Sequence, residues 1–137
     1  MDDNTRKHLI AQALEVRRHA YAPYSHYPVG AALLTQSGRV YTGVNVENAA
    51  YPSGICAERV AVFKAVSEGE RKFAAIVVAT DNGATPCGAC RQVLAEFGLD
   101  LEVVVVDGQG HILLDTTLEA LLPASFGPEK LPRPEDA

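Results

Sequence analysis

The sequence predicts an α/β protein, a three-layer α/β/α sandwich on a mixed five-stranded sheet, and three observations lead to that prediction. Segments with apolar residues at helical spacing alternate with short β-branched runs, in the order α-β-β-α-β-α-β-β-α. Turn residues at 37–38 and 107–110 join neighbouring strands as two hairpins. Strand–helix crossings lie between the hairpins, and such crossings place helices on both faces of a sheet. The length is typical of one domain, so a single domain is expected over 1–137.

The N-terminal half is expected to supply two helices and one hairpin. The first helix is predicted over 5–20, because apolar residues recur there every three or four positions. Asn4 or Thr5 can cap its start, and Pro23 ends it. A loop rich in Tyr and Pro follows over 21–28. The next predicted elements are a strand over 29–34, a strand over 39–46, a loop over 48–54 and a helix over 55–67.

The C-terminal half is expected to complete the sheet. The apolar, β-branched run 73–79 predicts a buried strand, and Gly98 ends a third helix over 87–97. The other predicted elements are a loop over 81–86, a strand over 101–106, an antiparallel strand over 112–114, a short helix over 117–122 and a proline-rich segment over 128–134. The second and third helices are expected to bury Val60, Val62, Phe63, Val66, Val93, Leu94 and Phe97.

The charge balance argues against a nucleic acid or a membrane as partner. The formal net charge is −5, whereas nucleic-acid binders usually carry a basic face. Arg17 and Arg18, followed by His19, form a basic cluster that is typical of a solvated helix surface. No apolar run approaches the roughly 20 residues that cross a bilayer, and the acidic N-terminus lacks the layout of a signal peptide. We therefore expect a cytoplasmic protein without nucleic-acid or membrane partners.

The three cysteines predict a metal site rather than disulfides. Cys56 begins the second predicted helix, and Cys87 and Cys90 lie in the first turn of the third. Helix N-termini favour anions, so the thiols there are expected to ionise, and thiolates bind zinc. Three protein ligands leave a fourth position for water, which is the mark of a catalytic zinc rather than a structural one. The sequence therefore predicts one catalytic Zn²⁺ per chain.

Charged residues next to the cysteines complete this candidate centre. Glu58, two residues after Cys56, is placed to accept a proton from water beside the open position without binding the metal. Three thiolates leave the zinc site with excess negative charge, which opposes the activation of water. Either Arg59 or Arg91 could donate to the sulfurs and offset this charge. The charge argument favours this role for Arg59, and for Arg91 it leaves an ordinary surface arginine as an equal alternative.

The chain also resembles the cytidine deaminase family, specifically its small homotetrameric, zinc-dependent type. Zinc deaminases with His/Cys/Cys or three-cysteine sites are a well-characterised class, so their signature and mechanism are not inferred from this chain. The resemblance covers nearly the whole chain. It rests on the segments Tyr24–Ala32, Gly43–Ala49, Cys56–Arg59, Pro86–Gln92 and Leu122–Pro128.

The resemblance implies a reaction and a set of substrate contacts. The reaction is hydrolytic deamination of cytidine and deoxycytidine to uridine and deoxyuridine plus ammonia, a step of pyrimidine salvage. Asn45 and Glu47 resemble residues that bind the ribose hydroxyls, and Tyr27 stands where the family usually has a phenylalanine near the pyrimidine. Tyr51 and Phe126 resemble residues that reach the site of a neighbouring subunit in the homotetramer. Backbone N–H groups at Ala57 and Cys87 are further candidates for fixing the base.

Two other interpretations of the cysteines remain open at this stage. A zinc deaminase acting on another aminopyrimidine, a nucleoside antibiotic or an RNA base would share Cys56, Glu58, Cys87 and Cys90. The segment 45–47 and the acidic charge favour a small free nucleoside. A non-catalytic zinc protein or a thiol redox protein would use only the Cys87–Cys90 pair, as such proteins do near helix starts. That interpretation leaves Cys56 and Glu58 without a role.

Overall fold

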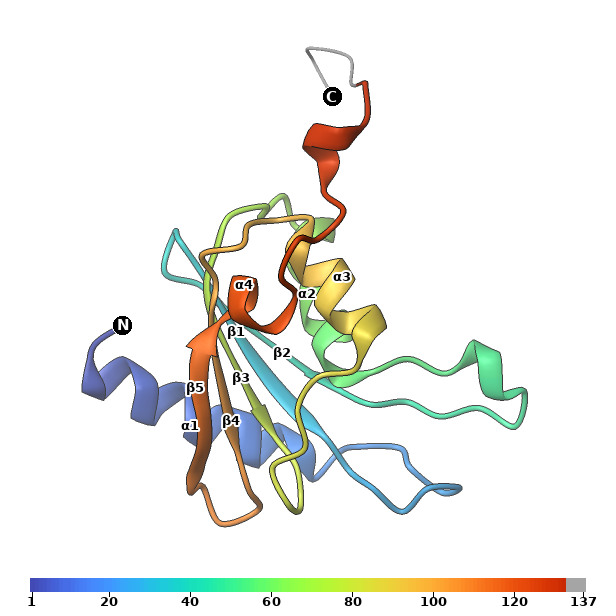
Figure 1. The fold of residues 1–137 in the computed structure, drawn as a ribbon. Coiled ribbons are helices and arrows are strands. Elements are labelled where there is room, and N and C mark those ends of the chain that lie inside the picture. The colour runs from blue at the N-terminus through green and yellow to red at the C-terminus, as the bar shows by residue number, and fades with distance from the viewer. Residues whose placement is uncertain (133–137) are drawn as a thin grey trace.

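The computed structural model describes residues 1–132 and confirms the predicted α/β sandwich. One five-stranded sheet in the order β2-β1-β3-β4-β5 has α1 on one face and α2, α3 and α4 on the other (Figure 1). Only β3 and β4 pair in parallel within this sheet. The elements are α1 Asp3–Arg17, β1 Gly30–Thr35, β2 Val40–Val44, α2 Ala57–Ser67, β3 Phe73–Ala79, α3 Gly88–Ala95, β4 Glu102–Val106, β5 Ile112–Thr117 and α4 Leu118–Leu121, with short 3₁₀ turns at Tyr51–Ser53 and Pro128–Lys130.

Alternating side chains of the central strands form two separate cores, because successive residues of a strand point to opposite faces. On β3, Ile76 and Val78 face α2 and α3, whereas Val77 faces α1. The first core also holds Val62 and Leu94, as predicted. The prediction for Phe63 is wrong, since this ring is 47% exposed. Helix α2 instead buries Ala57, Ala61, Val62 and Ala65 in this core.

Several element boundaries differ from the predicted ones. Helix α1 starts at Asp3 because the Asp2 carboxylate accepts a hydrogen bond from the backbone N–H of Thr5, 2.7 Å away, so Asp2 rather than Asn4 or Thr5 is the cap. The same helix ends at Arg17 instead of residue 20. The predicted loop 48–54 contains a 3₁₀ turn.

The other differences lie in the C-terminal half. Strand β5 continues to Thr117, beyond the predicted 112–114, because its ladder with β4 extends to the pair Glu102–Thr117. Helix α3 ends at Ala95, two residues before the predicted end. Residues 133–134 of the predicted proline-rich segment lie outside the described residues. None of these differences changes the order of the elements.

The start of α2 lies directly on strand β2 because Gly43 has no side chain. A Cβ atom at this position would lie 2.4 Å from the carbonyl oxygen of Ala57 and 2.6 Å from the backbone nitrogen of Ala61. Glycine therefore permits a helix–strand distance that any other residue would increase. This close contact places the first turn of α2, and Cys56 before it, at the edge of the sheet.

The N-termini of α2 and α3 meet beside the sheet, at the carboxyl end of β3. Cys56 is the N-cap of α2 and Cys87 is the N-cap of α3. The loop over 80–86 connects β3 to α3. The fold thus gathers the cysteines of two distant segments in one place. Among residues 1–132, every helix is too short or too polar to span a membrane.

Candidate active site

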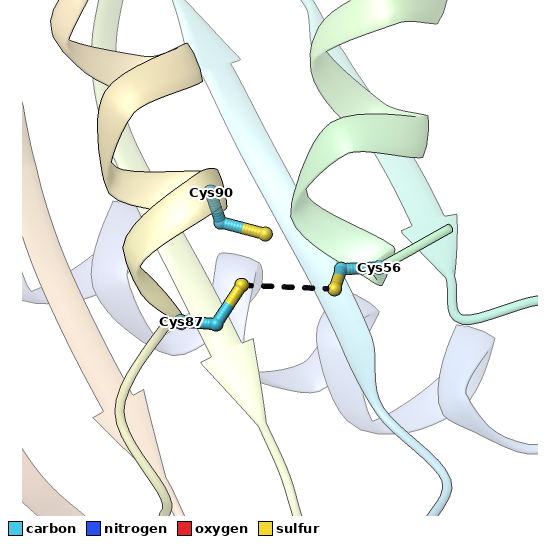
Figure 2. A group of neighbouring side chains, drawn as sticks. All are labelled: Cys56, Cys87 and Cys90. Atoms are coloured by element: carbon cyan, nitrogen blue, oxygen red, sulfur yellow. Dashed lines mark hydrogen bonds between the residues drawn. The ribbon is translucent and has the colours of Figure 1, made fainter. Parts of the chain in front are cut away.

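The three cysteine sulfurs form one compact cluster (Figure 2). The Sγ atoms of Cys56 and Cys87 are 3.9 Å apart, and all three sulfurs, including that of Cys90, lie within 4.8 Å of one another. A tetrahedral zinc with Zn–S bonds of about 2.3 Å holds its sulfurs about 3.8 Å apart. Among residues 1–132, no His, Asp or Glu ligand atom joins the cluster. The donor set therefore fits a zinc ion with three protein ligands.

The pKa values of the Cys56 and Cys90 thiols shift in opposite directions. The pKa of the Cys56 thiol is lowered to about 5, first by the hydrogen bond from the Cys90 thiol and further by the Arg59 guanidinium, against the opposing effect of burial. The pKa of Cys90 is raised, because this thiol donates that hydrogen bond and is buried. Cys87 is exposed. These shifts favour the thiolate form of Cys56 and the thiol form of Cys90.

The two arginines next to the cysteines have different surroundings. Nη2 of Arg59 donates to Sγ of Cys56 at 3.3 Å, and this contact raises the pKa of the guanidinium. Arg91 instead donates to the carbonyl oxygens of Pro86 and Leu121, at 2.7 and 2.9 Å, and to Oγ1 of Thr85, at 3.0 Å. Arg59 therefore meets the sulfur cluster, whereas Arg91 ties the loop before α3 to α4.

Glu58 lies in the first turn of α2 and is 4% exposed. Burial raises the pKa of its carboxyl group. Its side chain lines a cavity of about 440 Å³, which also receives Cys56 and Cys87. The full lining is Ser25, Tyr27, Val29, Asn45, Glu47, Cys56, Ala57, Glu58, Val78, Thr80, Ala84, Thr85 and Cys87. A cavity of this size is in the range for small-molecule sites.

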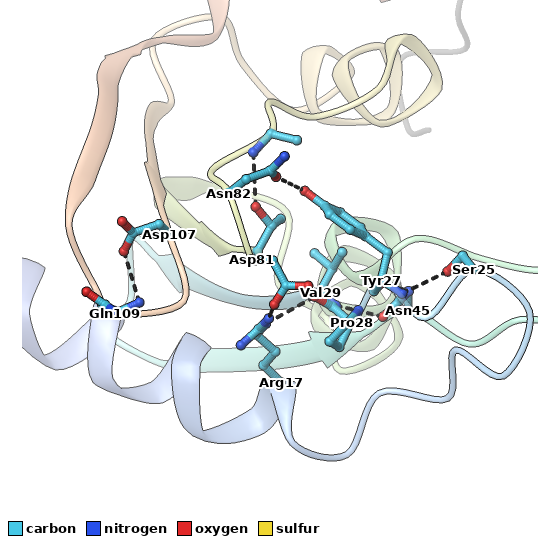
Figure 3. A network of polar contacts seen from close by, with 12 residues as sticks. Arg17, Ser25, Tyr27, Pro28, Val29, Asn45, Asp81, Asn82, Asp107 and Gln109 are labelled. Atoms are coloured by element: carbon cyan, nitrogen blue, oxygen red, sulfur yellow. Dashed lines mark hydrogen bonds and ion pairs between the residues drawn. The ribbon is translucent and has the colours of Figure 1, made fainter.

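The residues expected to bind a nucleoside form one wall of this cavity. Asn45 already holds the chain before β1, since its Nδ2 donates to the carbonyl of Tyr27 and its Oδ1 accepts from the backbone N–H of Val29, each at 2.9 Å (Figure 3). Glu47 accepts from the backbone N–H groups of Tyr24 and Ser25, at 3.0 and 3.1 Å, and from the Ser25 hydroxyl. These bonds lower the pKa of Glu47, the Ser25 hydroxyl contributing most.

Two of the residues expected near a substrate lie outside the cavity lining of their own chain. Tyr51 is 77% exposed and meets the ring of Tyr24 edge-on, with ring centroids 6.0 Å apart. Phe126 is 56% exposed, and its carbonyl accepts a hydrogen bond from Gln92 at 2.8 Å. Neither ring lines the 440 Å³ cavity of this chain.

A second wall of the cavity was not predicted from the sequence. It consists of Thr80, at the end of β3, and of residues 84–85 in the loop that follows. The hydroxyl of Tyr27 reaches across to Oδ1 of Asn82 at 2.5 Å (Figure 3). The position of Thr80 after a central buried strand was the available signal, because ligands bind at the carboxyl ends of such strands.

Arg17 corrects one interpretation of the basic cluster. Its side chain is only 18% exposed and contacts Asp81 and Pro28, so the expectation of a solvated surface is wrong for it. The expectation holds for Arg18, which is 67% exposed and pairs with Glu15.

Comparison with known proteins also indicates a zinc-binding site. Residues 3–106 match the family described as the cytidine and deoxycytidylate deaminase zinc-binding region. The chain is 49% identical over 126 residues to the cytidine deaminase of Sporosarcina psychrophila, covering 90% of this chain and 92% of that protein. It is 50% identical over 125 residues to a probable cytidine deaminase of Dictyostelium discoideum, covering 89% and 84%.

Solved structures agree with the sequence matches. The crystal structure of cytidine deaminase from Burkholderia pseudomallei superimposes with a TM-score of 0.84 at 46% identity. The match covers 92% of this chain and 100% of that one. The enzyme from Mycobacterium tuberculosis superimposes with a TM-score of 0.79 at 38% identity, covering 93% and 99%. The chain belongs to the cytidine and deoxycytidylate deaminase zinc-binding family.

Proposed function

We propose that this chain catalyses the hydrolytic deamination of cytidine and deoxycytidine, giving uridine and deoxyuridine plus ammonia. One observation carries the proposal. The buried carboxyl group of Glu58 and the sulfurs of Cys56 and Cys87 border the same 440 Å³ cavity. A metal site with a free position, a proton carrier and room for a nucleoside are the parts that this reaction needs.

Cys56, Cys87 and Cys90 are the residues that would hold the zinc ion. Zinc bound there supplies Lewis acidity at the position that the three sulfurs leave free. Arg59 withdraws negative charge from the Cys56 sulfur through its hydrogen bond, and so limits how far the thiolates weaken that acidity. The two helix N-termini that carry Cys56 and Cys87 act in the same direction.

Glu58 moves the protons. Its carboxylate takes a proton from the attacking water and delivers it to ring N3 while the new C–O bond forms at C4. It then takes the proton of the new C4 hydroxyl and gives it to the amino group, so that the C4–N bond breaks, ammonia leaves and a C4 carbonyl remains. The carboxyl group is 4% exposed, and this burial keeps bulk water from exchanging those protons.

The wall made by Tyr27, Asn45 and Glu47 is proposed to bind the nucleoside. An amide and a carboxylate offer the donors and acceptors that sugar hydroxyls need. The Tyr27 ring is proposed to pack near the pyrimidine, and Ala57, which lines the cavity, is proposed to offer its backbone N–H to the base. The negative charge of Glu47, with the net charge of −5, favours an uncharged nucleoside over a phosphorylated one.

The proposal also covers the oligomeric state, the domain organisation and the pathway of the enzyme. The exposed rings of Tyr51 and Phe126 are proposed to complete the sites of neighbouring subunits in a homotetramer. The residues 1–137 are proposed to act as one catalytic domain, in pyrimidine salvage. The cytoplasmic location expected from the sequence stays a prediction.

The test is an ultraviolet assay of the purified protein with cytidine, deoxycytidine, cytosine and deoxycytidine monophosphate. We expect turnover of the two nucleosides, loss of turnover after treatment with a zinc chelator, and recovery on addition of Zn²⁺. Elemental analysis should give one zinc per active chain. Faster turnover of cytosine or of the phosphorylated substrate would contradict the proposed substrate class. Dithiol–disulfide activity without deamination would support the redox alternative instead.

A further inference from the structure

Arg17, on the last turn of α1, joins two segments that border the cavity (Figure 3). Its Nε donates to the carbonyl oxygen of Pro28 at 3.1 Å, and its Nη2 donates to Oδ1 of Asp81. The side chain is 18% exposed, whereas its neighbour Arg18 is 67% exposed. One guanidinium therefore bridges two parts of the chain that lie far apart in the sequence.

Close packing of α1 on β1 brings Arg17 to this position. A Cβ atom on Gly30 would lie 2.1 Å from the carbonyl oxygen of Ala13 and 2.8 Å from Cβ of Arg17. Only glycine permits this distance between the helix and the start of the strand. The guanidinium is then within hydrogen-bond distance of Pro28, two residues before Gly30.

Neither acceptor of Arg17 lines the cavity itself, but each is next in the chain to residues that do. Pro28 stands between Tyr27 and Val29, which line the wall proposed to hold the nucleoside. Asp81 follows Thr80, which lines the other wall, and precedes Asn82. Asn82 accepts the hydroxyl of Tyr27 at 2.5 Å, so the walls are joined at the rim as well as through Arg17.

We infer that Arg17 is a positioning residue for the deaminase reaction, acting through Pro28 and Asp81 to set the separation of the cavity walls that enclose the pyrimidine. Arginine suits the task, because its planar fork holds two acceptors at fixed directions, whereas a lysine ammonium is a single point of contact. Asp81 is exposed, and such pairs contribute little to stability, so the pair is expected to affect geometry more than folding. The inference rests on the proposed function.

A wall that packs on the base binds substrate, transition state and product alike. Loosening it should therefore raise KM and leave kcat nearly unchanged. We expect Arg17→Gln to raise the KM for cytidine about tenfold and to weaken inhibition by the product uridine by the same factor. Arg17→Lys should recover part of the loss, since it can reach one acceptor. Zinc content should equal that of the wild type in both variants.

The experiment compares these variants with Arg18→Gln, which removes a neighbouring arginine that pairs only with Glu15 within the described residues 1–132. Arg18→Gln should have the KM of the wild type. Asp81→Ala should raise KM, and the double variant Arg17→Gln/Asp81→Ala should be no worse than Arg17→Gln alone, because the two residues act as one unit.

The outcomes separate the inference from the proposed function. A KM and a uridine inhibition constant for Arg17→Gln equal to those of Arg18→Gln would overturn the inference, as would a double variant whose effect is the product of the single ones. If Arg17→Gln does not fold, Asp81→Ala and Arg17→Lys decide, and wild-type constants in both would reject the positioning role. A wild-type protein that does not deaminate cytidine would reject the proposed function instead, and calorimetric binding of uridine would still report on the walls.

Discussion

Nη2 of Arg59 lies 3.3 Å from Sγ of Cys56, so the residue after the proposed proton carrier contacts a proposed zinc ligand. This hydrogen bond offsets the excess negative charge of three thiolates around one Zn²⁺. We expect Arg59→Gln to lower zinc affinity or activity by about 10- to 100-fold, the usual cost of losing a partner of a metal ligand. Competition with a chromogenic chelator, together with kcat, measures both effects.

Arg91→Gln is the matched control, because Arg91 is also next to a cysteine but bonds to Pro86, Thr85 and Leu121 instead of a sulfur. Its loss should lower the melting temperature and leave the zinc affinity of the folded protein close to that of the wild type. Equal zinc affinities for the Arg59 and Arg91 variants would contradict the assigned role of Arg59.

Removal of the carboxylate at position 58 should separate catalysis from metal binding. Glu58→Gln keeps the size of the side chain, and the three sulfurs are untouched, so one zinc per chain should remain. Activity should fall by about 10²- to 10⁴-fold or more, since positioned proton transfer contributes at least this much. Elemental analysis and the ultraviolet assay test the two statements on one sample. Turnover within tenfold of the wild type would remove Glu58 from the mechanism.

The sequence was sufficient to predict the metal cluster because Cys56 and Cys87 begin helices, with Cys90 in the first turn of the second, and helix starts are readable from local patterns. Cys56 and Cys87 were expected to meet, and the sulfurs are 3.9 Å apart. The buried run 73–79 was also predicted to the residue, since its apolar, β-branched composition fits only a central strand. Local signals of this kind do not depend on how distant loops are placed.

Contacts between distant loops could not be predicted in this way. Arg17 and Asp81 are 64 positions apart, and each is of a type that usually faces solvent. Their pairing depends on how closely α1 packs on β1 and on the path of the loop after β3. The boundary errors have a local cause: Asp2, Asn4 and Thr5 can all cap a helix, and the hydrogen bond from Thr5 to Asp2 decides between them.

The carboxyl group of Glu47 should titrate below the ordinary value of 4.5. Hydrogen bonds from Ser25 and Tyr24 favour the ionised carboxylate in the folded protein. The lowered pKa therefore stabilises the fold at pH values above the ordinary pKa of 4.5. That contribution is lost as the pH falls through the lowered pKa. Carbon NMR of the carboxyl group in the wild type should give this pKa, and Ser25→Ala should move it up toward 4.5. An unchanged pKa in the variant would contradict the importance of the Ser25 hydroxyl.

Gly43→Ala should damage the active site from a distance. The added Cβ would lie 2.4 Å from the carbonyl oxygen of Ala57, so α2 must move away from β2 and carry Cys56 and Glu58 with it. Overpacking of this kind costs about 1–3 kcal/mol, occasionally more. We expect a lower melting temperature and a loss of kcat in the protein that still folds. Gly69→Ala is the control for the substitution itself, because a Cβ there meets no atom within 4 Å, although its φ of +92° disfavours alanine. Wild-type kcat in Gly43→Ala would show that the close contact between α2 and β2 does not determine the geometry of the active site.

Phe126 is 56% exposed on its own subunit, and its ring is proposed to stack on a base bound by another. Stacking of a base on an aromatic ring contributes about 1–3 kcal/mol, so Phe126→Ala should lower kcat/KM by about five- to 150-fold. Glu58→Gln should be inactive for a different reason. If Phe126 acts across the interface, hybrids of the two variants contain some sites with both an intact Glu58 and an intact Phe126. In a random hybrid these are roughly a quarter of all sites. Hybrids purified through two different tags should therefore be clearly more active than the average of the two parents. If Phe126 serves the site of its own subunit, no site in the hybrid is complete, and its activity should equal the average of the parents.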